Sequence, residues 1–160
     1  MRQIAIRSAR PSDMDEVMRL YRQLMAFHEA LDPRLALDWD RLEAFRNYLT
    51  DVVLESASCR LLVAEAPPSP GLAGFILGRL AESPPIFAQP CYGLVSDVCV
   101  DENWRRQGMG RALFEALREW FREQRVRTMQ LNAASRNPVS QAFWRALGFT
   151  DLLDRLWSKV

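Results

Sequence analysis

Apolar residues in the first third of the chain recur at helical intervals. A short alternation over residues 4–7 favours a strand, and Ser12 and Asp15 then have the spacing of a helix-capping box. Every third or fourth position over residues 14–30 is apolar or weakly polar, which predicts a helix with one buried face. A second run of this period, over residues 39–53, predicts another helix. We therefore expect two helices before most of the sheet.

The middle of the chain has the shorter period of strands. Residues 67–71 contain three prolines and a glycine and separate two β-like runs, which indicates an antiparallel hairpin. Residues 83–90 contain three further prolines, which cannot donate hydrogen bonds, so we expect a loop there. The runs that predict strands are residues 60–66, 72–80, 92–100 and 128–134.

Strands and helices alternate in the second half. A helical period covers residues 108–124, and Asn137-Pro138 opens a further helix that Gly148 is well placed to end. The two strands that flank the first of these helices should be parallel and joined by a right-handed crossover. The whole order predicts an α/β (α+β) fold with a mixed sheet and helices packed on its faces. Residues 149–160 leave room for one or two short closing strands.

Composition narrows the class of protein. With 160 residues, 49% apolar and 26% charged, the chain should form one globular domain, residues 1–160. A formal charge of +1 without a run of like charges argues against nucleic-acid binding. The first residues lack the apolar block of a signal peptide and no stretch is long enough to span a membrane, so we expect a cytoplasmic protein. Three cysteines without metal-type spacing and a single histidine, His28, predict neither a disulfide nor a metal site.

One loop has the features of an anion site. Residues 105–110 read Arg-Arg-Gln-Gly-Met-Gly and lie where a predicted strand ends and a helix begins, so several backbone N–H groups lack helical partners. Gly108 and Gly110 let a phosphate approach the backbone, and the two arginines of the loop and Arg111 add positive charge. A tight turn that binds nothing is the alternative for such a glycine pair.

Two common nucleotide motifs do not fit this loop. A dinucleotide fingerprint would need a third glycine where the sequence has Leu113, and a P-loop would need Gly-Lys followed by Ser or Thr. We therefore expect neither a dinucleotide cofactor nor hydrolysis of ATP.

Two segments resemble signatures of the GCN5-related N-acetyltransferase (GNAT) family. Residues 98–113 are similar to that family's strand, its Arg/Gln-x-x-Gly-x-Gly/Ala coenzyme A loop and the helix after it. Residues 137–149 are similar to its second signature, an asparagine-led helix that ends in Gly-Phe. Both stand in the family's order and at a normal family distance. The opening Ile-Arg-Ser-Ala-Arg-Pro-Ser-Asp also looks similar, so the resemblance covers nearly the whole chain.

This resemblance implies a mostly antiparallel sheet whose central parallel strands splay apart, often at a bulge, and hold acetyl-coenzyme A (acetyl-CoA) as co-substrate. The pantetheine arm would bond the strand backbone, and the loop amides would hold the pyrophosphate. Asn137 has the alternative role of only capping its helix. The residues expected to contact acetyl-CoA are Val98, Val100, Arg105, Arg106, Gln107, Gly108, Met109, Gly110, Arg111, Asn137, Ser140 and Trp144.

The reaction needs a base near the thioester, because only a neutral amine attacks it and an alkyl amine, with a pKa near 10.4, is mostly protonated at pH 7. Asp97, in the middle of the strand, is our first candidate, with binding of a cationic substrate or pairing with an arginine as its alternative. His28 is the second, with packing on its helix as the alternative, and Glu29 and Tyr92 are weaker candidates. The Val98 N–H would meet the oxyanion.

Residue 144 departs from the family pattern. Many members carry a tyrosine seven residues after the helix-opening asparagine, which is thought to protonate the departing thiolate. This chain has Trp144 there, and an indole N–H is no acid at neutral pH. Water can protonate the thiolate instead, since a thiol with a pKa near 8.5 is a tolerable leaving group.

We predict an acetyl-CoA-dependent N-acetyltransferase that acts by direct attack in a ternary complex. The alternative is a non-catalytic acyl-CoA-binding sensor or interaction module, which Trp144 favours. The acceptor would be a small-molecule or protein amine, and Asp97, Glu29 and Asp32 favour a small cationic one. The aromatic C-terminus, with Trp157, suggests a homodimer through sheet edges, with burial in the core as the alternative.

Overall fold

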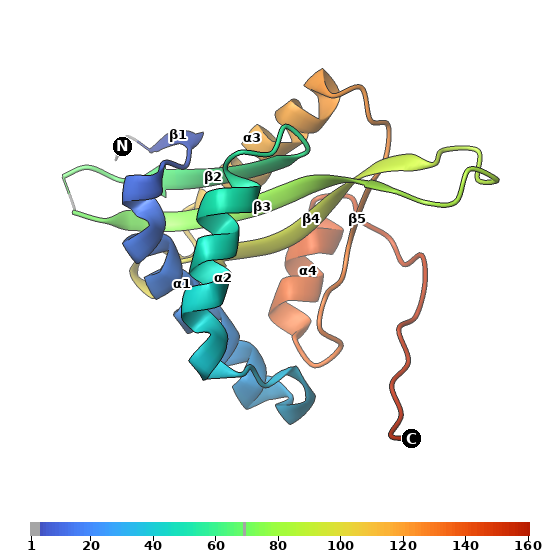
Figure 1. The fold of residues 1–160 in the computed structure, drawn as a ribbon, viewed down its shortest axis with the longest axis horizontal. Coiled ribbons are helices and arrows are strands. Elements are labelled where there is room, and N and C mark those ends of the chain that lie inside the picture. Colours follow the sequence, from blue (N-terminus) through green and yellow to red (C-terminus); the bar gives the residue numbers. More distant parts are fainter. Residues whose placement is uncertain (1–3, 69) are drawn as a thin grey trace.

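The described residues form a sheet of five strands in chain order. The computed structural model of the protein describes residues 4–68 and 70–160, and its strands lie side by side as β1–β2–β3–β4–β5 (Figure 1). The first three pairings are antiparallel and β4 pairs with β5 in parallel, which confirms the predicted mixed sheet. The strands are β1 (Ala5–Ser8), β2 (Cys59–Glu65), β3 (Leu72–Glu82), β4 (Cys91–Val100) and β5 (Met129–Leu131).

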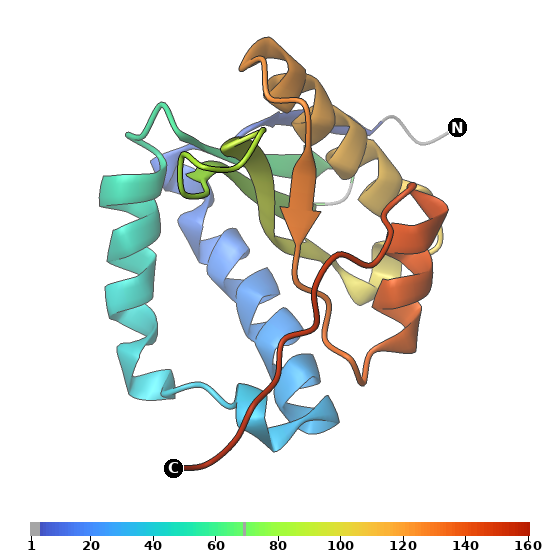
Figure 2. The same cartoon turned by 90° about the vertical axis from the view of Figure 1, so that its right-hand side faces the viewer.

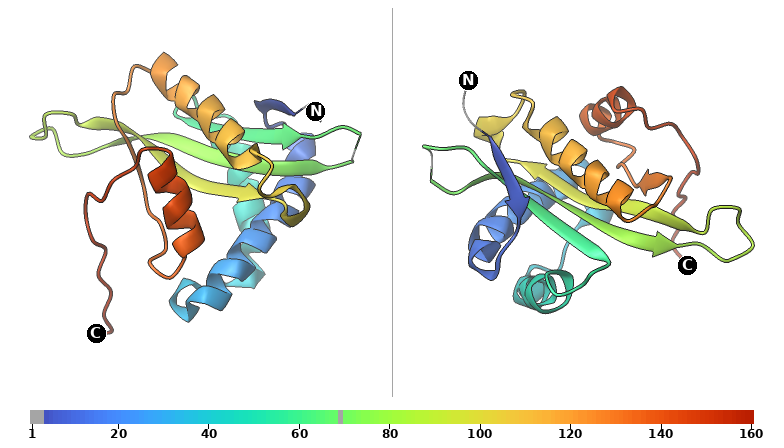
Figure 3. Two further views of the ribbon diagram at one scale, coloured as in Figure 1. Left: turned by 180° about the vertical axis from the view of Figure 1, so that it is seen from behind. Right: turned by 90° about the horizontal axis from the view of Figure 1, so that it is seen from above.

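Helices cover both faces of this sheet, as predicted (Figure 3). Adjacent residues of β3 such as Phe75 and Ile76 point into different apolar cores, because side chains alternate along a strand. One core lies under α1 and the α2 region, and the other under α3 and α4. The helices are α1 (Met14–Leu31), α2 (Leu42–Tyr48), α3 (Met109–Glu123) and α4 (Pro138–Ala146).

The start of α1 differs from the prediction. A 3-10 turn that ends at Asp13 precedes the helix. The Asp13 carboxylate accepts the Arg10 N–H at 2.7 Å and two bonds from the Arg7 guanidinium at 2.7 and 2.9 Å. The expected capping box between Ser12 and Asp15 is therefore wrong, because Asp13, held by an arginine of β1, makes the backbone bond instead.

The second predicted helix is broken into short pieces. Residues 39–53 begin as a 3-10 turn, continue as α2 and end in a π-helical turn, Leu49–Val53. Trp39 and Val52, which the sequence pattern placed on the apolar side, are exposed, and only Leu49 and Val53 are buried in this stretch. Packing therefore stabilises the C-terminal end of residues 39–53. The exposed remainder of this stretch lacks the packing that would stabilise one continuous helix.

The closing strands expected over residues 149–160 are wrong, since this segment forms no strand in the structure. β5 is also shorter than the predicted residues 128–134, and its three residues offer little edge for a further strand to pair with. Residues 151–160, which we call the tail, are exposed and cross in front of the sheet toward the C-terminal end of α1 (Figure 2). There the Trp157 ring lies 5.6 Å from the Arg34 guanidinium.

Candidate functional site

A β-bulge at Ser96 decides which way the side chains of β4 point. In the register with β3, Leu77 lies opposite Asp97 and the next residue, Gly78, lies opposite Val95, so Ser96 is extra. Such an insertion reverses the alternation of the strand beyond it. The consequence is that the second half of β4 presents the opposite set of side chains to each face.

The bulge places Asp97 on the face of α1. Val95 and Val98, three residues apart, both pack toward the core under α3, which only the extra residue allows. Cys99 faces the core under α1, and Asp97, two residues earlier, shares its side. Asp97 and Val98 therefore point to opposite faces of β4.

The open edge of β4 begins directly after the bulge. β4 and β5 pair only from Gly93 to Val95, and the Gly93 N–H donates to the Thr128 carbonyl at 2.9 Å. At the far end the Asp101 N–H turns to β3 and donates to Ala73 at 2.9 Å. Because backbone groups alternate between the two edges, those of Val98 and Val100 point away from β3, into the space left by β5. This arrangement is the splay that the resemblance to the GNAT family implied.

The loop before α3 presents unpaired backbone donors. All residues of α3 are described, and its first backbone hydrogen bond runs from the Ala112 N–H to the Gly108 carbonyl at 3.0 Å. The N–H groups of Met109, Gly110 and Arg111 therefore have no partner within α3. Gly108 has a φ of +82° and Arg106 a φ of 59°. Left-handed residues that alternate in this way turn successive N–H groups into a concave surface suited to an anion.

The side chains of the loop divide into two groups. The Arg105 Nε donates to the Val100 carbonyl at 3.2 Å, which links the loop to the open edge of β4, while Arg106 and Arg111 are exposed. The Gln107 amide donates to the Asn103 carbonyl at 3.0 Å and braces the loop. Three arginines thus lie within the same short segment as the free N–H groups, a donor set that fits a pyrophosphate.

Two residues of the loop, Met109 and Gly110, contribute to the packing of α3 against its neighbours. Met109 is 1% exposed and packs in the core, so its side chain cannot reach a ligand. A Cβ at Gly110 would lie 3.3 Å from the Phe143 ring and 3.6 Å from the Val100 side chain, so this glycine lets α3, α4 and β4 approach each other. A Cβ at Gly108 would meet nothing within 4 Å, which leaves that side of the loop open.

Asp97 is a half-buried carboxylate that no described residue binds with a hydrogen bond or ion pair. Burial raises the pKa of its carboxyl to about 6, against a smaller lowering by the Arg79 charge. On the facing helix, burial and the charge of Asp97 raise the pKa of Tyr21 to about 12. An unpaired carboxylate with a raised pKa beside an open strand edge is suited to take a proton near neutral pH.

His28 lies further along α1 than the part that faces Asp97. It follows Tyr21 by two helical turns, roughly 10 Å, and burial lowers the pKa of its imidazole. The structure therefore does not bring the two candidate bases together. Of the weaker candidates, Glu29 accepts a bond from the Trp39 indole at 3.3 Å, and Tyr92 lies near the start of β4, before the bulge.

Asn137 caps α4. Its Oδ1 accepts the Ser140 N–H at 3.0 Å, and the residue is 6% exposed. Among the described residues its Nδ2 group has no hydrogen bond, so the amide can still donate to a ligand. The two roles proposed for this residue are thus compatible.

Trp144 packs in the core. It is 6% exposed, and its ring lies 5.7 Å from that of Phe114, 4.9 Å from Phe143 and 5.5 Å from Phe149, each at a steep angle. Contact with acetyl-CoA was expected of this residue, and we now assign it the role of holding α4 against α3.

We expect Trp144→Phe to lower the free energy of unfolding by about 1 to 3 kcal/mol, because the smaller ring leaves a cavity in this aromatic cluster. Since Trp144 gives no proton, the pH dependence of kcat should stay that of the wild type. Denaturant unfolding and a pH–rate profile measure the two effects. A lost alkaline limb in the variant's profile would contradict the packing role.

The sequence analysis missed the contact that fixes the end of β4. Asp101 is 8% exposed, caps the next turn through the Asn103 N–H at 3.0 Å, and binds Arg19 of α1 at 2.6 Å. The aspartate before Glu-Asn-Trp was a readable capping signal. Its arginine partner, 82 positions away in the chain, was not.

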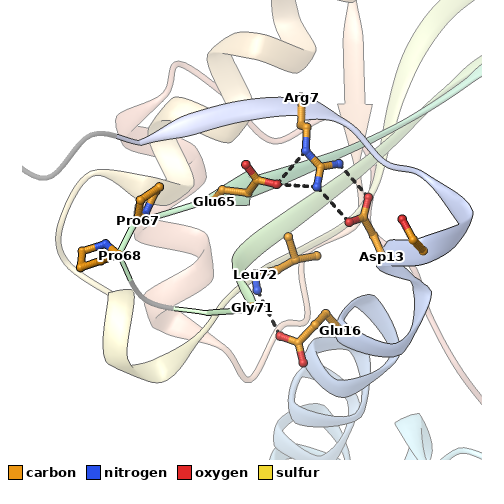
Figure 4. Close-up of a pocket in the computed structure, with 9 residues that line it drawn as sticks. Arg7, Asp13, Glu16, Glu65, Pro67, Pro68, Gly71 and Leu72 are labelled. Carbon is orange, nitrogen blue, oxygen red and sulfur yellow. Dashed lines mark hydrogen bonds and ion pairs between the residues drawn. The ribbon is translucent and has the colours of Figure 1, made fainter.

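A second group of charges, at the start of α1, has a structural role. A hollow of about 350 Å³ lies there, and Figure 4 shows Arg7 between Asp13 and Glu65. The Arg7 Nε donates to Glu65 at 2.8 Å, and Glu16 accepts the Leu72 N–H at 3.1 Å. These groups satisfy one another and tie β1 and the start of β3 to the N-terminal end of α1.

The chain belongs to the acetyltransferase (GNAT) family, whose model matches residues 15–149. No curated protein matches it. Within the described residues there is no helix whose length and apolar character would suit a membrane crossing, and no group of three or more His, Cys, Asp or Glu is placed to hold a metal ion.

Solved structures with the same fold carry diverse descriptions. A tetramutant of the BH1408 protein from Bacillus halodurans has a TM-score of 0.82 at 22% identity, over 98% of this chain and 99% of that one. Aminoglycoside N-acetyltransferase AAC(6')-Iy in complex with CoA has a TM-score of 0.76 at 17% identity, over 100% and 96%. A transcriptional regulator from Bacillus halodurans C-125 has a TM-score of 0.77 at 18% identity, over 99% and 100%. At these identities the likeness establishes the fold.

Proposed function

We propose that this protein transfers the acetyl group of acetyl-CoA to a primary amine, by direct attack in a ternary complex. The observation that carries the proposal is the bulge at Ser96. It sets the unpaired Asp97 carboxylate on one face of β4 and opens the backbone of Val98 and Val100 on the edge that leads to the loop before α3. Membership of the GNAT family and the CoA complex of a similar aminoglycoside N-acetyltransferase support it.

The residues present fit acetyl-CoA as co-substrate. Its thioester supplies the activated acyl group. The free N–H groups from Arg106 to Arg111 would hold its pyrophosphate, with Arg105 close by, and the backbone of Val98 and Val100 would bond its pantetheine as an added strand. From the start of α4, Asn137 and Ser140 would bond the same arm.

Asp97 would remove the proton of the acceptor amine, directly or through water. With a pKa of about 6 its carboxyl is ionised at neutral pH and still close enough in basicity to take a proton. His28, at the end of α1, is the second candidate for this role. Cys99, two residues after Asp97, is buried, and burial raises the pKa of its thiol to about 11. This cysteine is therefore unsuited to form a covalent acyl-enzyme.

A non-catalytic acyl-CoA-binding module is the rival proposal. Trp144 favours it, since the residue that would act as an acid in many relatives is a core tryptophan here. A transcriptional regulator among the similar structures shows that proteins of other descriptions share the fold.

Release of free thiol separates the two. The wild type is incubated with acetyl-CoA and neutral, cationic and anionic primary amines, and thiol is followed with time. An enzyme should release thiol in proportion to the amine supplied, whereas a binding module should show a melting temperature raised by acetyl-CoA without thiol release. That second result, with every amine in the panel, would overturn the proposed reaction.

A further inference from the structure

Arg79 of β3 and Asp97 of β4 point to the same side of the sheet. Leu77 lies opposite Asp97 in the register of the two strands, and directly opposed residues share a face. Leu77 packs in the core under α1, and Arg79, two residues further along β3, points to the same side. The two charged side chains are therefore diagonal neighbours on the α1 side of the sheet.

These two charges lie close together without pairing. The Cα atoms of diagonal neighbours on adjacent strands are roughly 7 to 8 Å apart, a distance that long side chains can bridge. Burial raises the pKa of Asp97, and the charge of Arg79 lowers it by a smaller amount, as expected of groups this near. Yet no hydrogen bond or ion pair joins these two described side chains. One small molecule can therefore contact the guanidinium and the carboxylate at once.

Arg79 is exposed and has no hydrogen bond or ion pair among the described residues. Figure 1 shows β3 running on past α1 and α2 toward the tip of its hairpin with β4. The nearest neighbours of Arg79 on its side of the sheet are all uncharged, and they are Cys59, Leu77, Ala81 and Leu94. Its guanidinium is therefore available to an anion from outside the chain.

Asp97 and Arg79 together favour a zwitterion. Each contributes one charge that the described residues leave unpaired, and the two charges have opposite sign. A diamine would bring its second ammonium group against Arg79, and a simple alkyl amine would leave the guanidinium without a partner. An amino acid satisfies both groups, because its carboxylate matches the forked N–H groups of an arginine.

We propose that the acceptor is a short amino acid whose amine lies at Asp97 and whose carboxylate is bound by Arg79. The inference rests on the proposed function for its amine half. In the reaction the amine nitrogen bonds the acetyl carbon as the C–S bond breaks, its proton passes to Asp97, and water protonates the departing thiolate. Arg79 takes no part in these steps and determines which amines bind in position for them.

Amines of matched length test the charge of the acceptor. Glycine, β-alanine and 4-aminobutyrate are each compared with the alkyl amine and the terminal diamine that have the same number of carbons. We expect the best of the three amino acids to have a kcat/KM at least about 10-fold above both of its partners. An alkyl amine or a diamine that equals or exceeds the amino acid in every set would overturn the proposal.

Two substitutions of Arg79 test the residue assignment. In Arg79→Gln the ratio of kcat/KM for the best amino acid to that for its alkyl amine should fall about 10- to 100-fold. Arg79→Glu should reverse the preference, so that the diamine exceeds the amino acid of the same length. Arg122→Gln, at an exposed arginine of α3 on the other face of the sheet, is the control and should leave the ratio unchanged. A ratio in Arg79→Gln equal to that of the wild type would refute the role of Arg79.

Direct binding separates this inference from the proposed reaction. Glycine, β-alanine and 4-aminobutyrate are titrated calorimetrically into the protein, with and without CoA. Binding of any of the three that Arg79→Gln weakens at least about 10-fold supports the carboxylate site even if no amine is acetylated. Equal binding by wild type and variant, or binding of none of the three, overturns it even if acetylation of other amines is found.

Discussion

Asp97→Asn should lower kcat/KM for amine acetylation by roughly 10²- to 10⁴-fold and leave the affinity for acetyl-CoA unchanged. The asparagine keeps the shape of the side chain and cannot take a proton. Co-substrate affinity should survive because the contacts assigned to acetyl-CoA lie on the other face and the open edge of β4. Turnover and calorimetric binding of acetyl-CoA measure the two quantities on one preparation.

The pH profile identifies the base more sharply than the size of the loss. If Asp97 takes the proton of the ammonium form, which dominates at all pH values below about 10, only the carboxylate of Asp97 titrates in this range, so log kcat/KM of the wild type should rise with a slope of 1 below about pH 6 and become level above it. In Asp97→Asn only the amine titrates, so the slope should be 1 throughout. A bend at pH 6 that persists in the variant would move the base to His28 or to water.

Stability gives an independent check on the environment of Asp97. Its carboxyl has a folded-state pKa raised from 3.8 to about 6, so the folded state binds the proton more tightly and stability falls as pH rises from about 4 to 6. Asp97→Asn removes this cost and should be more stable than the wild type at pH 8, by up to about 3 kcal/mol. Asp101→Asn is the matched control of opposite sign, since that carboxyl has a lowered pKa and an ion pair with Arg19 to lose.

The features that could be predicted from the sequence are those that depend on residues close to one another in the chain. The parallel pair, the loop before α3 and the helix that starts at Asn137 follow from periods and turn residues within a few positions of each other. The bulge at Ser96 does not, because an extra residue is visible only once the register with β3 is known. Its effect on Asp97 is therefore a result of strand pairing.

The pairing of charges near the end of α1 could not be read from the sequence for the same reason. Asp32 and Glu29 are acidic in the sequence, yet Asp32 is paired with Arg34 and lies 3.8 Å from Arg136, which is distant in the chain. The core position of Trp144 was partly readable, since a residue seven positions after Asn137 lies on the same helix face, and both are buried. The sequence pattern indicates the face of α4 on which Trp144 lies. Its contacts with Phe114 and Phe149 are known only from the structure.

Gly108→Val should abolish the rise in melting temperature that acetyl-CoA causes in the wild type. At a ligand concentration of 100 Kd that rise corresponds to about 2.7 kcal/mol, or roughly 5 to 10 °C for a chain of this length. Gly108 has a φ of +82° that a β-branched residue strongly disfavours, while nothing within 4 Å would clash with its Cβ. The substitution therefore changes the path of the backbone and scatters the N–H groups of the loop without disturbing the core.

Gly148→Val is the matched control, because Gly148 also has a positive φ, +95°, and nothing within 4 Å of its Cβ, but ends α4 instead of opening α3. Both variants should lose a similar stability, on the order of 1 to 2 kcal/mol, from the same backbone strain. Only Gly108→Val should lose the response to acetyl-CoA. Gly110→Val is less informative, since its side chain would press on Phe143 and shift α4. A folded Gly108→Val protein that responds to acetyl-CoA as the wild type does would show that the loop is a tight turn and that the pyrophosphate is held elsewhere.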